Sequence, residues 1–184
     1  MRLIGTGRAP ASALLLALAA CATKPSTDMP ALPTFDAVAA VVAIRTAGSA
    51  DASELDVQPL RDPQVEDLRE QAAALETRRM YRAAADALDA ALAINPDDPA
   101  LLQERAEAAL LQHQLPDAER FAQRAFAAGS KVGPLCRRHW ETIAQVRAGL
   151  AAAPAHVDAA AGPSIVADAR RQRDACTVSA PNRF

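Results

Sequence analysis

The chain has 184 residues, enough for one domain with tails, and its formal net charge is −2. Because a negatively charged chain has no general attraction to a phosphate backbone, we do not expect nucleic acid as a partner. Apolar residues make up 51% of the sequence but aromatic residues only 3%. Alanine, the strongest helix former, is the commonest apolar residue, so an all-α chain is predicted.

The first twenty residues are typical of a cleavable export signal. Arg2 and Arg8 give the start a positive charge, and residues 9–20 form an uncharged stretch. This stretch of about twelve residues is too short to cross a hydrocarbon core of about 30 Å as a helix, and its length fits the apolar region of a signal peptide. We therefore predict that residues 1–20 are removed.

The sequence Leu18-Ala19-Ala20-Cys21 resembles a lipobox, the processing site of bacterial lipoproteins. The resemblance implies that Cys21 carries diacylglycerol, becomes the first mature residue and is acylated on its new amine. Two or more acyl chains anchor a protein stably to a membrane. Ala22 in place of aspartate implies the outer membrane, with the protein facing the periplasm. Two alternatives are ordinary cleavage after Ala17-Leu18-Ala19, which would give a soluble periplasmic protein, and an uncleaved membrane helix.

Residues 21–62 are predicted to form a lipidated, mostly extended tether. Pro25, Pro30 and Pro33 lie among polar residues, and proline lacks the N–H that a helix or sheet needs. The apolar stretch over residues 36–45 is an exception. It is predicted to be a short helix capped by Asp36, although a buried strand would fit the same pattern.

From Pro63 onward the apolar residues recur with the period of a helix. Four helices are predicted, over residues 63–79, 81–94, 99–113 and 116–128. The sequence between the second and third is a strong helix breaker, in which Asp98 can cap the next helix and Pro99 can occupy its first position.

This block repeats itself after 34 residues with two helices per unit, the spacing of tetratricopeptide repeats. The matching pairs are Leu68 and Leu102, Ala72 and Ala106, Ala84 and Ala118, Ala91 and Ala125. Residues 65–130 therefore resemble a pair of such repeats, and the small residues would let the two helices of each hairpin approach closely. Gln71, Arg105, Ala109 and Ser130 depart from the family pattern. A generic helical bundle is the alternative.

Two repeats are fewer than the three that usually make a stable stack. Residues 134–150 are predicted to form an amphipathic capping helix, and Pro154 is expected to prevent a full third repeat. The fold class expected is thus an all-α solenoid of helical hairpins over residues 63–152, with a partly helical tail over residues 153–184. In an oxidising compartment Cys136 and Cys176 are predicted to form a disulfide, with two buried free thiols as the alternative.

In tetratricopeptide proteins, peptides bind the face formed by the first helix of each repeat. The positions that the resemblance places on that face are mostly acidic, which implies a basic or neutral partner segment. They are Glu66, Arg69, Glu70, Ala73, Glu76, Gln103, Glu104, Glu107 and Leu111. The alternative is that these glutamates only solvate a helix face.

The sequence contains no arrangement that predicts catalysis. Its histidines are scattered, no glycine-rich phosphate loop is present, and Cys136 with His139 cannot complete a tetrahedral metal site. We therefore expect no enzyme activity, no metal and no cofactor. The expected function is a lipid-anchored adaptor that binds another, unknown protein of the cell envelope. A structural lipoprotein without a peptide groove and an accessory subunit of an envelope enzyme are the alternatives.

Overall fold

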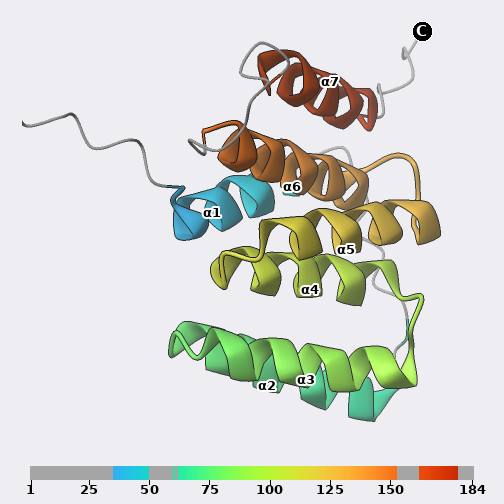
Figure 1. Cartoon of the computed structure of the whole chain (residues 1–184). Helices are drawn as coiled ribbons and strands as arrows, with labels where there is room; N and C mark the ends of the chain where they lie inside the picture. The colour runs from blue at the N-terminus through green and yellow to red at the C-terminus, as the bar shows by residue number, and fades with distance from the viewer. Residues whose placement is uncertain (1–34, 50–59, 61, 153–161, 178–184) are drawn as a thin grey trace, which may run out of the picture. The chain divides into compact units, whose positions relative to one another are not determined.

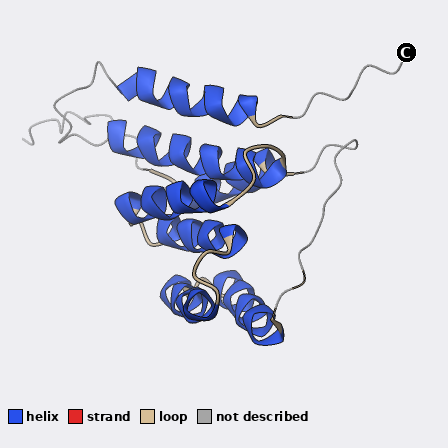
Figure 2. Ribbon diagram, turned by 90° about the vertical axis from the view of Figure 1, so that its right-hand side faces the viewer, coloured by secondary structure: helices blue, strands red, loops and turns tan. Residues whose placement is uncertain are grey.

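The computed structural model describes residues 35–49, 60, 62–152 and 162–177. Within these residues all regular structure is helical, and the helices pack in neighbouring pairs, which confirms the predicted all-α helical-hairpin fold (Figures 1 and 2). The helices are α1 (Ala37–Ala47), α2 (Pro63–Thr77), α3 (Tyr81–Ile94), α4 (Pro99–Leu111), α5 (Leu115–Ala128), α6 (Pro134–Ala151) and α7 (Gly162–Ala175). The predicted signal peptide, Cys21 and most of the predicted tether lie outside the described residues.

Aspartate side chains fix where three of the helices begin. The carboxylate of Asp98 accepts hydrogen bonds from the backbone N–H groups of Ala100 and Leu101, at 2.8 and 3.1 Å. Asp36 and Asp62 cap α1 and α2 in the same way. These bonds satisfy N–H groups that have no partner inside the helix. The capping residues therefore explain why the sequence located these three starts correctly.

Alanine lies where the helices of the first two hairpins meet. Ala72 of α2 and Ala84 of α3 are buried in one apolar cluster. Ala106 of α4 and Ala118 of α5 are completely buried one hairpin later. A larger side chain at these positions would push the paired helices apart. The repeated alanines that suggested the 34-residue period therefore have a packing role.

The third pair of helices is formed by α6 and α7. The sequence predicted α6 as a capping helix followed by a partly helical tail, and the helix of that tail, α7, packs along α6 (Figure 1). Val166 and Ala169 of α7 are buried, and Ala169 lies in the same apolar cluster as Ile143 of α6. Pro154 lies outside the described residues, after the end of α6 in the sequence and before the start of α7. Since proline interrupts a helix only locally, it does not prevent a third hairpin.

Helix α1 belongs to the folded domain, although the sequence suggested a domain that begins at residue 63. It packs against α4 and α6 rather than against α2, the next helix in the chain (Figure 1). Its buried face includes Val41 and Ile44, which lie in one apolar cluster with Leu110 of α4 and Val146 of α6. The apolar stretch over residues 36–45 is thus a helix, as predicted, and it covers part of the predicted groove face.

Candidate functional site

An open cavity of about 380 Å³ lies against α2, bounded also by α1, α3, α4 and α6, and we call it the α2 groove. Seven of the nine predicted groove residues line it: Glu66, Arg69, Glu70, Ala73, Glu76, Glu104 and Leu111. Gln103 and Glu107 do not line it, because both are completely buried in the interior of the domain. The prediction that these two side chains face a ligand is therefore wrong.

The floor of the α2 groove is apolar. Leu88 of α3 and Ala108 and Leu111 of α4 lie there, and Ala72 and Ala84 mark the α2–α3 contact. The alanines among these residues leave space between the helices that larger side chains at the same positions would fill. The groove can therefore accept apolar atoms in its depth and polar atoms at its rim, as binding sites in proteins commonly do.

Arginines neutralise much of the predicted acidic surface. The Arg69 guanidinium lies between Glu66, at 2.8 Å, and Glu104 of the next hairpin, which Nε contacts at 2.9 Å. The hydrogen bond to Glu104, followed by the charges of both carboxylates, outweighs desolvation and raises the pKa of Arg69. The groove is therefore less acidic than the sequence implied. The Arg69–Glu104 pair spans 35 residues, about one repeat, so the repeat period was a signal for it.

A second arginine, from outside the repeats, crosses the end of the groove. Arg45 of α1 contacts Glu76 of α2 at 2.8 Å and Glu107 of α4 at 2.9 Å. Burial alone would lower the pKa of Arg45, but the hydrogen bonds and charges of the two glutamates raise it. Nothing in the local sequence indicates this contact, because it depends on where α1 packs.

The groove still keeps a negative surplus. Among the described residues that line it there are four carboxylates, those of Glu66, Glu70, Glu76 and Glu104, and three guanidinium groups, those of Arg45, Arg69 and Arg138. Within the described residues, Glu70 is exposed and has no hydrogen-bond or ion-pair partner. The site can therefore still attract a positively charged group.

A buried polar network lies behind the groove and joins α4 to α6. The side-chain amide of Gln103 donates to Glu107 at 2.9 Å and to Thr142 at 2.8 Å. Its carbonyl oxygen lies 2.7 Å from Nδ1 of His139. Since a carbonyl oxygen only accepts, we assign the proton of the neutral imidazole to Nδ1. All four side chains are fully buried.

Burial, reinforced by the charges of Arg138 and Lys131, lowers the pKa of His139 to about 3. The unfolded chain binds a proton at this residue below pH 6.5, whereas the folded chain does not. His139 therefore contributes stability above pH 6.5 that is lost as the pH falls toward 3. Between pH 7 and pH 5 we expect it to cost about 2 kcal/mol of unfolding free energy.

In His139→Gln, whose amide can still donate to Gln103, the loss of unfolding free energy between pH 7 and pH 5 should be about 2 kcal/mol smaller than in the unmodified protein. Urea denaturation of both proteins at pH 7 and pH 5 measures the difference. NMR of the His139 imidazole in the folded protein checks the assignment directly. A protonation midpoint above pH 5 would contradict it.

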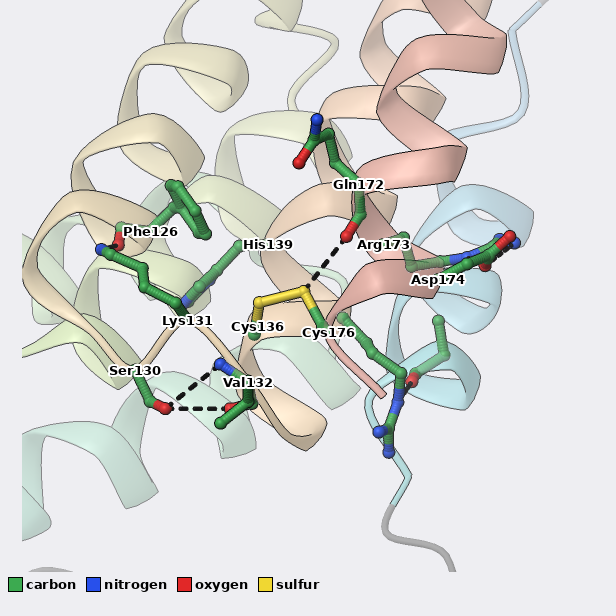
Figure 3. Close-up of a disulfide and its surroundings, with 12 residues drawn as sticks. Phe126, Ser130, Lys131, Val132, Cys136, His139, Gln172, Arg173, Asp174 and Cys176 are labelled. Carbon is green, nitrogen blue, oxygen red and sulfur yellow. Dashed lines mark hydrogen bonds and ion pairs between the residues drawn. A yellow bond between two sulfur atoms is a disulfide. The ribbon is translucent and has the colours of Figure 1, made fainter. Parts of the chain in front are cut away.

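A disulfide between Cys136 and Cys176 fastens the third hairpin (Figure 3). Cys136 lies in the first turn of α6 and Cys176 directly follows α7, with their Cα atoms 5.7 Å apart. Both cysteines are buried. Beside the bond, Arg173 of α7 contacts the buried Glu141 of α6 at 2.6 Å. The groove-bearing hairpins are thus closed at one end by a covalently attached helix.

Other kinds of site have no support in the described part of the chain. It contains no group of three or more histidine, cysteine, aspartate or glutamate side chains that could hold a metal ion. No helix there has both the length and the apolar character needed to cross a membrane. Comparison with protein-family models, curated proteins and solved structures finds no match to this chain.

Proposed function

We propose that this protein is a non-catalytic adaptor, anchored to the cell envelope by lipid on Cys21, that binds a segment of another envelope protein in the α2 groove. The groove carries the proposal. It combines an apolar floor with a charged rim and is large enough for several side chains. The lipobox-like sequence Leu18-Ala19-Ala20-Cys21 supports the anchor and the location.

The resemblance to tetratricopeptide repeats supports a peptide as the ligand. The groove lies on the first helices of two successive hairpins, α2 and α4, which is the face that binds peptides in that family. Residues from hairpins one repeat apart, such as Glu70 and Glu104, meet around a single cavity. Such a surface offers contacts to several residues of a partner segment at once.

Filling the groove should remove the partner. Ala73 is exposed on α2 and lines the groove, so Ala73→Trp places a large ring in the cavity without burying a new side chain in the core. We expect crosslinking in intact cells, read by mass spectrometry, to show about a tenfold loss of the groove partner, equivalent to about 1.4 kcal/mol. Ala74→Trp is the matched control, because Ala74 is exposed on the same helix but does not line the groove.

A crosslinking pattern that is the same for Ala73→Trp, Ala74→Trp and the unmodified protein would refute the adaptor function. It would favour a structural lipoprotein that uses no groove. The N-terminal peptide from the same digest reports the anchor, since lipidation of Cys21 adds the mass of the acyl chains. A mature N-terminus without that mass would remove the anchor from the proposal.

A further inference from the structure

We infer that the partner segment is apolar and carries an arginine or lysine whose charge binds Glu70, and that α1 is a built-in example of such a segment. This inference rests on the proposed function and specifies the chemistry of the ligand. Two observations support it. The first is the set of contacts that bind α1 to the domain, and the second is the open α2 groove beside α1, where Glu70 has no partner among the described residues.

Helix α1 binds the neighbouring part of the same face through apolar residues and one arginine. Ile44 is completely buried in the cluster that contains Leu110 and Leu111 of α4. The next residue, Arg45, places its guanidinium between Glu76 and Glu107. Glu76 and Leu111 are predicted groove residues that line the cavity, so a segment of this chain already binds beside the groove with this chemistry.

The α2 groove lies next to the surface that binds α1, and it also combines apolar residues with carboxylates. Its floor is apolar, and the carboxylate of Glu70 at its rim has no partner among the described residues. Arg69 is already shared by Glu66 and Glu104, so it does not neutralise Glu70. An apolar segment with one cation would complement both the floor and the remaining negative charge.

The surface beside α1 indicates where the segment continues. A smaller cavity of about 200 Å³ lies between α1 and the end of α2 and shares Arg45, Glu76 and Leu111 with the α2 groove. Val38 and Val42 line it, one helical turn apart, and are 54% and 60% exposed. Exposed valines beside an open cavity favour an apolar neighbour. A segment in the groove can therefore extend along α1.

The sign of the charge also argues against the linker of this chain as the occupant. Residues 50–61, which connect α1 to α2, contain Asp51, Glu54 and Asp56 but only one basic residue, Arg61. A net negative segment would be repelled by the surplus carboxylates of the groove. We therefore assign the groove to a segment of another protein rather than to this linker.

Two labelled peptides test the inference against the full chain, purified in detergent. The first copies residues 41–47, Val-Val-Ala-Ile-Arg-Thr-Ala, with blocked ends, and the second replaces its arginine by the uncharged isostere citrulline. Fluorescence anisotropy should show that the arginine peptide binds about three- to fivefold more tightly, the size expected for an exposed charge pair. This preference should shrink as salt is added.

Glu70→Gln should abolish the preference for arginine and leave the affinity for the citrulline peptide unchanged. Asp67→Asn is the matched control, because Asp67 lies on the same helix, is exposed and does not line the groove. It should keep the preference. A peptide that merely exchanged with α1 in its own position would keep the preference in Glu70→Gln, and that result would overturn the inference.

Equal binding of the two peptides, or no binding at millimolar concentration, would also overturn it. The proposed function is tested separately by the crosslinks. If Ala73→Trp removes the partner and Glu70→Gln does not, the groove binds a partner but not through a cation. If Ala73→Trp has no effect, the adaptor function itself fails.

Discussion

Replacing Glu107 by alanine is expected to lower the free energy of unfolding by about 2–3 kcal/mol, the size expected when charge-assisted hydrogen bonds to a buried carboxylate are lost and its partly exposed arginine partners stay behind. The Glu107 carboxylate is completely buried and accepts hydrogen bonds from Arg45 at 2.9 Å, Arg138 at 2.7 Å and Gln103 at 2.9 Å. Without it, the Arg138 guanidinium loses its carboxylate and the Gln103 amide loses an acceptor. Urea denaturation followed by the fluorescence of Trp140, the only tryptophan, measures the loss.

Two comparisons test whether the loss of stability comes from the hydrogen bonds of the buried Glu107. Glu70→Ala removes an exposed glutamate that has no partner among the described residues, so its effect should stay within about 0.5 kcal/mol. Hydrogen exchange should rise in α1 and in the N-terminal half of α6, where Arg45 and Arg138 lie, before it rises in α3. A cost below about 1 kcal/mol for Glu107→Ala would mean that the buried network does not hold these helices together.

The helices could be predicted from the sequence because their signals are local. Asp36, Asp62 and Asp98 cap helices within three residues of themselves. Ala72 and Ala84 lie on faces that a period of 3.6 residues already identifies as apolar. Such signals need no knowledge of the rest of the chain, and this explains why α2 to α6 begin and end within two residues of their predicted bounds.

The charge of the groove could not be predicted because it depends on distant partners. Arg45 is 62 residues from Glu107, and Arg138 is 31 residues away. Glutamates at groove positions look the same in the sequence whether they face solvent, an arginine or the interior. The position of α1 over α4 decides which of these occurs, and α1 lies in a stretch whose predicted role was a tether.

The packing of α7 against α6 also depends on residues that are distant in the sequence. Pro154 is a real helix breaker, but it says nothing about whether a helix that starts after it returns to the stack. The apolar positions Val166 and Ala169 make a short and weak pattern in a helix rich in arginine. The two cysteines were the stronger signal, since a bond between Cys136 and Cys176 requires the end of α7 to lie at the start of α6.

Removing this disulfide in the double variant Cys136→Ala, Cys176→Ala is expected to destabilise the domain by about 4 kcal/mol. The bond joins residues 40 apart, and in the chain-entropy model a cross-link over such a loop removes that much free energy from the unfolded state. Both cysteines are replaced together because a single variant would leave a reactive thiol. Urea denaturation of the variant and of the oxidised protein gives the difference.

The loss should be concentrated in the third hairpin. Helix α7 buries few large side chains: without the covalent link it is held mainly by Val166, Ala169, the contact between Arg173 and Glu141 and the backbone hydrogen bond from Gly133 to Cys176. Hydrogen exchange in α7 should therefore rise toward that of an open helix, while α2 and α3 keep their protection. The unmodified protein, reduced and kept in reducing agent without a blocking group, serves as the control and should match the double variant. If α7 stays as protected as α2 in both, apolar packing alone holds it and the disulfide is not its main attachment.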